Sequence, residues 1–386
     1  MTALRSTVID VDLDAIAHNV GSIRRKAPGV QVIAVVKADA YGHGAEVTSR
    51  ALVECGADML AAYTADEAVA LRRSGITSRV LVLSSVSDAA EAAAAVEHDL
   101  DVVVWDEERA GALAAAARAS RRSARVHVKV DTGLTRLGVM PDRAVELYRR
   151  VRGTSGLEVE GAMTHFANAD VERDTFTDEQ MRRFCAFLDA IGERPRLVHA
   201  AASAGMAIDA GVTLSAVRPG LAIYGLHAEP FLEPALELRP ALRWTSRIHR
   251  VATVPAGTGV GYGHPYRTPG DARIATVPVG YGDGLQRAAR DAEVLIRGAR
   301  ARIARRVAMD MFMVDVSAIT GAAEGDEVVL IGEQGGDRLT AEDLARSCAT
   351  INYEIVTGLR RRVARRYWRE GRVVATRTLA DGVVWS

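Results

Sequence analysis

The sequence carries little lysine, little cysteine and no excess of charge of either sign. Its 49 basic and 49 acidic residues cancel, which excludes a global electrostatic attraction to nucleic acid or anionic lipid. The three cysteines, Cys55, Cys185 and Cys348, stand far apart in the chain. Neither a disulfide framework nor a metal-ligand spacing is therefore predicted, and we expect a reducing, cytoplasmic environment.

Long apolar runs are also missing. No segment approaches the roughly 20 apolar residues that cross a bilayer, and acidic residues occupy the place where a secretion signal would have its apolar core. We therefore expect no membrane attachment. The one strongly basic run, 359–369, is interrupted by Val363, Tyr367 and Trp368. This interruption favours a solvated strand or helix face over a nucleic-acid patch.

The scarcity of lysine directs attention to the few that remain. Only Lys26, Lys37 and Lys129 are present, although the chain uses arginine freely. Arginine cannot replace lysine where chemistry needs an amine that deprotonates. Lys26 lies in a polar helix end and is expected at the surface. Lys37 and Lys129 end apolar runs and are the candidates for such chemistry.

The chain of 386 residues is long enough for two domains. Between residues 31 and 217, short β-branched runs alternate with helix-period stretches, which predicts a (β/α)8 barrel. An open doubly wound sheet would want a glycine-rich dinucleotide turn after the first strand, where this chain has Lys-Ala-Asp-Ala-Tyr. The predicted strands are 31–36, 58–63, 79–84, 101–105, 125–130, 157–164, 196–201 and 213–217.

After about residue 240 the segments become short, β-rich and punctuated by glycine and proline, which is typical of antiparallel strands. We therefore expect a barrel domain over 12–238 and a mainly β domain over 239–386. The opening strand, 8–13, precedes the first helix and is extra to the barrel. It is expected to pair with the β domain, which would then include residues 1–11.

Unusual residues follow the predicted barrel strands, at the end where barrels carry their active sites. The loops after strands seven and eight, with Ser203 and the Gly220-Leu221 turn, offer a hydroxyl and exposed amides for a phosphate. No acidic pair for Mg²⁺ and no cysteine cluster for zinc is present there. A phosphate beside a strand-terminal lysine suggests lysine-bound pyridoxal phosphate. The residues expected at this mouth are Lys37, Tyr41, Lys129, Arg136, His165, Ser203, Arg218 and Gly220.

All of these residues except Ser203 lie in segments that resemble the alanine racemase family. The resemblance implies a barrel plus a β domain, a head-to-tail homodimer with shared active sites, and pyridoxal phosphate as cofactor. It also implies interconversion of L- and D-alanine, which supplies D-alanine for cell-wall peptidoglycan. The similar segments occur in the family's order and span nearly the whole chain: VVKADAYGHG (35–44), KVDTGLTRLG (129–138), THFA (164–167), VRPGLAIYG (217–225), VGYGHPY (260–266), VGYGDG (279–284), RVAMD (306–310) and INYEI (351–355).

Racemisation must remove the Cα proton from one face and deliver a proton to the other, so two proton carriers are needed. By resemblance, Lys37 handles the proton of the D-enantiomer. Tyr262, reaching in from the partner subunit, handles that of the L-enantiomer. A free phenol ionises near pH 10, so a phenolate near neutral pH needs stabilisation. His165 resembles the family's hydrogen-bonding partner for this tyrosine.

Three further basic residues have roles implied by the resemblance. Arg218 corresponds to the residue that faces the pyridine nitrogen of the cofactor. Because arginine donates and cannot accept a proton, it should leave that nitrogen unprotonated and limit transamination. Arg136 corresponds to the residue that contacts the substrate carboxylate and the phenolic oxygen of the cofactor. Lys129 corresponds to a lysine often carbamylated in the family, although a plain strand lysine remains an alternative.

The remaining site residues are carried over by resemblance alone. Met309 corresponds to a partner-subunit residue whose backbone touches the substrate carboxylate. Tyr262 and Tyr353 would crowd the substrate and favour a small side chain, hence alanine. The expected phosphate contacts are Tyr41, Ser203, Gly220, Leu221 and Tyr353, and the expected entrance residues are Tyr281, Arg306, Asp310, Asp170 and Arg287.

Ala202, Ala308, Gly261 and Asp39 depart from the family's usual Asn, Cys, Ser and Asn. The small Ala202 predicts a slightly roomier site, which leaves serine as an alternative substrate to alanine. None of them removes a proton carrier. The main alternative is a pyridoxal-phosphate decarboxylase of related architecture, against which Arg218 and the Tyr262 motif argue. Small barrel proteins that only carry the cofactor end after the barrel, and a metal hydrolase would need a ligand cluster.

Overall fold

The computed structural model describes residues 4–386, and the chain divides into two compact units. The barrel unit comprises Ala15–Tyr41 and Thr48–Arg239. The C-terminal unit comprises Pro240–Ser386 together with Gly42–Val47 and the chain up to Asp14.

The barrel unit contains a closed ring of eight parallel strands, and the predicted fold class is confirmed. The ring closes where Gln31 of the first barrel strand pairs with Ala216 of the last. Most of these strands are buried on both sides and are rich in Val, Ile, Leu and Ala, as expected for parallel strands enclosed by helices. The strands are β2 (Gln31–Val35), β3 (Met59–Ala62), β4 (Val80–Val82), β5 (Asp101–Val104), β6 (Ala124–Lys129), β7 (Leu157–Met163), β8 (Leu197–His199) and β9 (Ala216–Val217).

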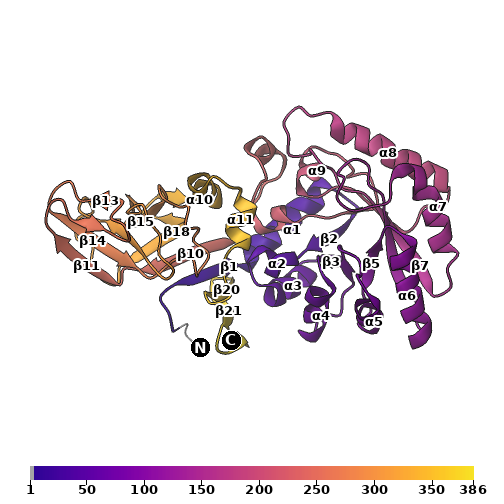
Figure 1. Cartoon of the computed structure of the whole chain (residues 1–386), viewed down its shortest axis with the longest axis horizontal. Helices are drawn as coiled ribbons and strands as arrows, with labels where there is room; N and C mark the ends of the chain where they lie inside the picture. The colour runs from indigo at the N-terminus through magenta and orange to yellow at the C-terminus, as the bar shows by residue number, and fades with distance from the viewer. Residues whose placement is uncertain (1–3) are drawn as a thin grey trace. The chain divides into compact units, whose positions relative to one another are not determined.

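Helices surround the barrel strands (Figure 1). Several begin at residues suited to capping: Thr64 and Glu67 form a capping box, and the Asp88 and Asp106 carboxylates accept from backbone amides in the first turn of their helices. The helices are α1 (Leu13–Lys26), α3 (Ala45–Glu54), α4 (Ala65–Arg73), α5 (Ala89–Glu97), α6 (Glu107–Ser120), α7 (Pro141–Arg152), α8 (Phe176–Ile191) and α9 (Ser203–Ala207), with 3₁₀ turns η1 (Leu221–Tyr224) and η2 (Pro230–Ala235).

The C-terminal unit is mainly β, with a nine-stranded sheet, a three-stranded sheet and a two-stranded ribbon. Its short helices are α10 (Ala341–Cys348) and α11 (Asn352–Thr357). Its strands are β1 (Val8–Asp12), β10 (Leu242–Arg247), β11 (Arg250–Val254), β12 (Gly259–Val260), β13 (Tyr266–Arg267), β14 (Ala272–Val277), β15 (Glu293–Ile296), β16 (Ala299–Arg302), β17 (Phe312–Asp315), β18 (Glu327–Gln334), β19 (Asp337–Leu339), β20 (Ala364–Arg369), β21 (Arg372–Thr378) and β22 (Gly382–Trp385).

The opening strand β1 lies inside the large sheet of this unit, between β10 and β20. It pairs antiparallel with β10 and parallel with β20, so its expected pairing with the β domain is confirmed. The parallel pairing departs from the all-antiparallel arrangement that the segment style predicts. It is possible because β1 and β20 come from opposite ends of the chain and need no tight turn between them.

The expectation of a solvated face for the basic run is wrong for Arg365. This residue lies on the interior strand β20 and has 0% of its surface exposed. Its guanidinium donates to the carbonyl oxygens of Gly42, Leu359 and Val363, which compensates for burying the charge. The neighbouring Arg366 points to the other face and pairs with Asp10 at 2.7 Å.

Candidate active site

Lys37 begins a left-handed turn at the end of the first barrel strand. The segment Lys37–Tyr41, marked α2 in Figure 1, has φ of 52°, 56° and 53° at Ala38, Asp39 and Ala40. Tyr41 follows at φ 51°. Each residue other than glycine in this conformation costs about 1–2 kcal/mol. Such strain persists where the surroundings enforce it, and it concentrates at functional sites.

Contacts from neighbouring elements hold this turn. The Ala38 amide donates to Glu67 Oε1 at 2.7 Å. Tyr41 stacks on the Tyr224 ring at 5.0 Å, and the Tyr224 hydroxyl donates to the Val35 carbonyl at 2.9 Å. A Cβ at position 220 would lie 2.5 Å from the Tyr41 hydroxyl oxygen. Glycine at 220 therefore lets the Tyr41 hydroxyl reach the loop after β9.

The two loops predicted to hold a phosphate meet in the structure. The amides of Gly220 and Ala222 donate to Ser203 Oγ at 3.0 and 3.1 Å. These three residues and Leu221 are buried. The sequence predicts exposed amides in this turn, and for Gly220 that expectation is wrong because the Ser203 hydroxyl already accepts from it. The structure does bring together Tyr41, Ser203, Gly220 and Leu221.

Basic side chains converge at the carboxyl end of the barrel strands. Burial, and next the positive charge of Arg136, lower the pKa of Lys37, while Glu67 opposes this shift. Burial, and next the charges of Arg218 and Arg136, lower the pKa of Lys129 to about 8. A site with several cations and lowered lysine pKa values suits an anionic ligand and an amine that must lose a proton.

The loop after β6 is ordered by one carboxylate. Asp131 accepts hydrogen bonds from the backbone amides of Gly133, Thr135 and Arg136 at 2.9, 3.0 and 3.1 Å. Gly138 has φ 137°, and a Cβ there would lie 2.6 Å from the Asp131 amide nitrogen. The DTGLTRLG segment is thus folded around Asp131, and the Arg136 side chain is left at the exposed edge of the loop.

Arg218 is buried, with 3% of its surface exposed, and is held by the protein. Its Nη1 donates to His199 Nδ1 at 2.7 Å, and the two hydrogens of Nη2 are shared among the Thr164 carbonyl at 2.8 Å, the Ala200 carbonyl at 2.9 Å and His165 Nδ1 at 3.2 Å. Burial lowers the pKa of Arg218 to about 9. Because this value is still above neutral pH, the guanidinium stays charged there. Within residues 4–386, Arg218 Nε–H has no protein hydrogen-bond partner, and Nη1 uses one of its two hydrogens.

His165 is neutral with its proton on Nε2. Burial, and next the positive charge of Arg218, hold its pKa well below the usual range. Because Arg218 can only donate, His165 Nδ1 must accept, and the ring proton then lies on Nε2. His165 can therefore offer a hydrogen bond to an anion but is a poor general base.

Tyr262, Met309 and Tyr353 belong to the C-terminal unit, so their approach to the barrel residues stays a prediction. Tyr262 is 75% exposed and lies between two glycines with positive φ. Its backbone carbonyl accepts a hydrogen bond from Arg306 Nη1 at 2.8 Å, which holds the backbone in place while the side chain stays exposed. Met309 is 54% exposed, and its carbonyl accepts from the Gly282 amide at 2.8 Å.

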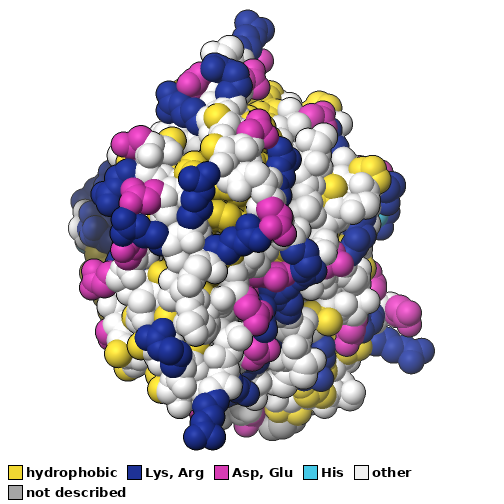
Figure 2. Space-filling view, turned by 90° about the vertical axis from the view of Figure 1, so that its right-hand side faces the viewer, with side chains coloured by type: hydrophobic (Ala, Val, Ile, Leu, Met, Phe, Trp, Pro, Cys, Tyr) yellow, Lys and Arg dark blue, Asp and Glu magenta, His cyan; other side chains and the backbone are white. Residues whose placement is uncertain are grey.

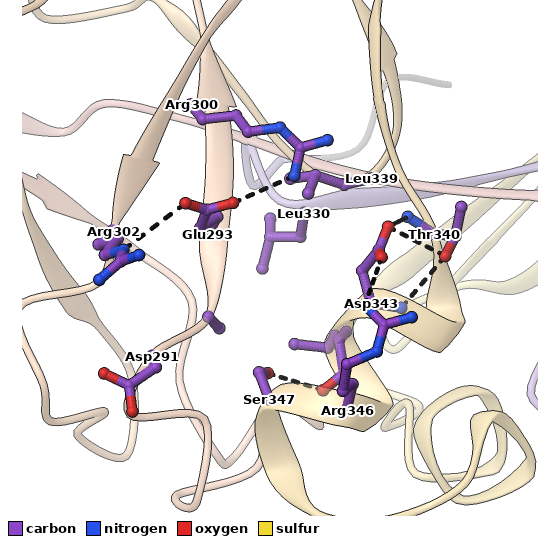
Figure 3. A pocket seen from close by; sticks show the side chains of 12 residues that line it. Asp291, Glu293, Arg300, Arg302, Leu330, Leu339, Thr340, Asp343, Arg346 and Ser347 are labelled. Carbon is purple, nitrogen blue, oxygen red and sulfur yellow. Dashed lines mark hydrogen bonds and ion pairs between the residues drawn. The ribbon is translucent and has the colours of Figure 1, made fainter.

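A separate cavity in the C-terminal unit contains none of the predicted site residues (Figure 3). It has a volume of about 310 Å³. Two of its acidic side chains already have partners, with Glu293 3.1 Å from Arg300 and Asp343 3.0 Å from Arg346. It is lined by Asp291, Ala292, Glu293, Arg300, Arg302, Leu330, Leu339, Thr340, Asp343, Leu344, Arg346 and Ser347.

The surface gives no single-sign patch on the face seen in Figure 2, where basic and acidic side chains are intermingled. No helix within residues 4–386 combines the length and apolar character needed to cross a membrane. The same part of the chain holds no group of three His, Cys, Asp or Glu side chains placed to bind a metal ion.

Sequence reasoning missed part of the site. His199, at the end of the seventh barrel strand, is fully buried and bonded to Arg218. Its ring also contacts His127, which contacts Asp101. One signal was available: polar residues interrupt apolar strands in DVVVW (101–105) and HVKV (127–130). A polar residue at an inward position of a barrel strand requires a buried partner.

Comparisons with known proteins agree with this architecture. Residues 11–228 match the model of the alanine racemase N-terminal domain, and residues 241–367 match that of the C-terminal domain. The alanine racemase of Symbiobacterium thermophilum is 41% identical over 95% of this chain and 98% of its own length. That of Halothermothrix orenii is 39% identical over 94% and 97%.

Solved structures are similar over nearly the whole chain. Alanine racemase from Bacillus anthracis, with bound L-Ala-P, superposes with a TM-score of 0.92 at 36% identity, covering 98% of this chain and 99% of that one. The enzyme from Streptomyces coelicolor superposes with a TM-score of 0.87 at 37% identity, covering 95% and 98%. A closed parallel barrel followed by a mainly β unit is the architecture that this chain shares with these isomerases. The chain belongs to the alanine racemase family.

Proposed function

We propose that this isomerase interconverts L- and D-alanine with pyridoxal 5′-phosphate attached to Lys37. The observation that carries the proposal is that Lys37 lies near Arg136 and Lys129 at the barrel mouth and has a lowered pKa. The Tyr41 hydroxyl lies beside Gly220, whose amide donates to Ser203. The hydroxyls of Tyr41 and Ser203 are the polar groups proposed to contact the cofactor phosphate. Leu221 of the same turn and Tyr353 are the further phosphate contacts. When bound, the cofactor withdraws the electron pair left at Cα.

The proton transfers are assigned to two residues of this chain. Lys37 takes the Cα proton of D-alanine, and its lowered pKa increases the fraction of free amine at neutral pH. Tyr262 takes the proton of L-alanine from the opposite face. His165 supports it, because a neutral ring with Nε2–H can donate a hydrogen bond to the phenolate. Arg136 and the Met309 backbone hold the substrate carboxylate.

The proposed assembly is a homodimer in which each subunit lends Tyr262 and Met309 to the site of its partner. Both side chains are large, apolar or amphipathic, and more than half exposed. Met311 lies in the same segment and is also exposed. Clusters of exposed apolar side chains are typical of surfaces that another chain covers.

The test is chiral analysis of the products after purified holoenzyme is supplied with L-alanine, and with L-serine in parallel. We expect D-alanine to accumulate to a near-equal mixture. Faster racemisation of serine would keep the reaction class but change the preferred substrate. The small side chain of Ala202, next to Ser203, would then explain the space for the serine hydroxyl. Release of CO₂ without a D-product would contradict the proposal.

The biological role proposed is the supply of D-alanine for peptidoglycan in a reducing, cytoplasmic compartment. All three cysteines, Cys55, Cys185 and Cys348, are free thiols, in agreement with such a compartment. Expression in a bacterium that cannot make D-alanine should restore growth on medium without it. Failure to restore growth, despite racemase activity in the lysate, would point to a different role.

Replacing Arg218 by glutamate should lower racemisation and raise transamination. A carboxylate near the pyridine nitrogen would favour its protonated form, whereas the arginine guanidinium does not. The measurement is the ratio of D-alanine to pyruvate formed from L-alanine. An unchanged ratio in a folded variant would contradict the assigned position of Arg218.

Carbamylation of Lys129 is expected to increase with pH through about 8. Only the neutral amine reacts with CO₂, and the pKa of Lys129 is lowered to about 8. At a fixed concentration of dissolved ¹³CO₂, the carbamate signal in the carbon NMR spectrum should be small at pH 7 and larger at pH 9. Lys129→Arg should remove that signal, and its persistence in this variant would assign the carbamate to another amine.

A further inference from the structure

A line of polar side chains passes through the interior of the barrel, which in this fold is normally filled by apolar residues. We call Asp101, His127, His199 and Arg218 the core hydrogen-bond chain. Asp101 begins β5, His127 lies within β6, His199 ends β8, and Arg218 follows β9. The core hydrogen-bond chain thus runs from the amino ends of the barrel strands to their carboxyl ends, where the proposed active site lies.

Each link is a short contact between buried atoms. Asp101 Oδ2 lies 3.2 Å from His127 Nε2, His127 Nδ1 lies 2.8 Å from His199 Nε2, and His199 Nδ1 lies 2.7 Å from Arg218 Nη1. The side chains of Asp101, His127 and His199 have no exposed surface. A buried series of this kind is stable only if each donor meets an acceptor.

The positions of the protons follow from the arginine. Because Arg218 has only donors, His199 Nδ1 must accept, and the proton of His199 then lies on Nε2. That proton is donated to His127 Nδ1, so His127 also carries its proton on Nε2 and donates it to the Asp101 carboxylate. Burial, and next the charge of Arg218, hold the pKa of His199 well below its usual range, which agrees with a neutral ring.

The far end of the core hydrogen-bond chain is anchored by ion pairs. Asp101 accepts from Arg79 and, at 2.8 Å, from Arg125 Nε. Burial by itself would raise the pKa of Asp101, but hydrogen bonds from His127 and Arg79 lower it to about 2. The carboxylate is therefore charged at working pH and can hold His127 in one orientation.

A glycine makes room for the central ring. Gly161 of β7 lies beside His127 in the barrel, and a Cβ there would be 2.2 Å from His127 Nδ1. This is the atom that accepts from His199. The backbone of Gly161 does not need glycine for its φ, since it is absent from the positive-φ residues of the described chain. Its lack of a side chain is explained by the ring it accommodates.

We propose that Asp101, His127 and His199 are positioning residues for Arg218, and that they fix its guanidinium from the opposite end of the barrel. The proposal rests on the role of Arg218 at the pyridine nitrogen given above. The other Arg218 partners are the Thr164 and Ala200 carbonyls and His165, all at the carboxyl end of the barrel. The core hydrogen-bond chain is therefore the only link from Arg218, among the described residues, to the amino end.

The first test reads the tautomers directly and needs no activity. In ¹⁵N-histidine-labelled holoenzyme, the nitrogen shifts of His127 and His199 should report a bare Nδ1 and a protonated Nε2 from pH 6 to pH 9. Assignment comes from the single variants His127→Leu and His199→Leu. A doubly protonated His199, or a proton on its Nδ1, would overturn the proposal whether or not the enzyme racemises alanine.

The second test compares two carboxylates of the same ion-pair cluster. Asp101 and Glu160 both pair with Arg79, Glu160 at 2.6 Å. Only Asp101 of these two carboxylates also contacts His127. In the holoenzyme, Asp101→Asn and His127→Leu should lower kcat roughly tenfold, by analogy with other outer partners of functional groups, with KM within about twofold. Both should raise the pyruvate share of products from L-alanine.

The matched control, Glu160→Gln, should leave kcat and the product ratio within about twofold of the wild type. Equal changes in Asp101→Asn and Glu160→Gln would show that loss of the ion-pair cluster is responsible, and would overturn the positioning role. Gly161→Ala gives an independent check, because it displaces the His127 ring without removing any polar group. If the wild-type enzyme does not racemise alanine, the proposed function fails, and the tautomer test still decides the proposal.

Discussion

Replacing Lys37 by alanine should lower kcat/KM for alanine racemisation by at least about 10³-fold in both directions, because one residue both attaches the cofactor and carries a proton. The structure gives the amine two properties suited to these tasks. It begins a constrained left-handed turn, and its pKa is lowered by burial and by Arg136. Activity is measured by chiral analysis from each enantiomer, and the lysine-bound cofactor by its visible absorbance.

The matched control for this prediction is Lys26→Ala. Lys26 ends α1 and pairs with Asp209 at 2.7 Å, and it has no place in the proposed site. Its loss should leave both rates within about twofold. If Lys37→Ala kept more than a tenth of wild-type activity while Lys26→Ala kept all of it, the proton carrier would have to be another residue. Loss of activity with normal lysine-bound absorbance would place the cofactor on a different lysine.

Replacing Tyr262 by phenylalanine should separate the two faces of the reaction. In deuterated water, exchange of the Cα proton of L-alanine should fall by about 10²–10⁴-fold, the usual contribution of a positioned acid or base. Exchange from D-alanine should fall far less, because Lys37 still takes that proton. Tyr262 is largely exposed in the subunit, so Tyr262→Phe should leave the stability of the subunit unchanged.

Tyr266 supplies the control for this second prediction. It lies four residues further along, and its hydroxyl donates to Asp315 at 2.5 Å inside the C-terminal unit. Tyr266→Phe should reduce the thermal midpoint of unfolding but leave both exchange rates within about twofold. Equal losses of exchange from both enantiomers in Tyr262→Phe would favour a positioning role for this tyrosine and contradict a second base.

Much of the barrel could be predicted because its signals are local. β-branched runs and capping residues such as Thr64, Asp88 and Asp106 reflect short-range preferences, and the barrel strands lie close to the predicted ranges. The site residues Lys37, Ser203 and Arg218 could be placed at one mouth because parallel strands share a carboxyl end. Burial of Arg365 could not be predicted, because its carbonyl partners include Gly42, which is remote in sequence.

The left-handed turn is the clearest case in which the local signal points the wrong way. Ala38, Asp39 and Ala40 all have positive φ, yet none of them is glycine, the residue from which positive φ would be predicted. Alanine by itself favours the right-handed helix. The turn is held by Glu67 and by the stacking of Tyr41 on Tyr224. These residues belong to different elements of the barrel, so the conformation depends on contacts that form only when the barrel closes.

The sequence by itself determined the type and order of the elements, the two-part organisation and the family, because hydrophobic period, turn residues and ordered motifs are properties of short segments. The tertiary structure alone decided which buried polar groups meet. Asp101, His127 and Arg218 lie on three separate strands or loops, and only closure of the barrel brings them within hydrogen-bonding distance through His199. Desolvation in that interior also sets the pKa values of the lysines, since burial is the first cause of both shifts.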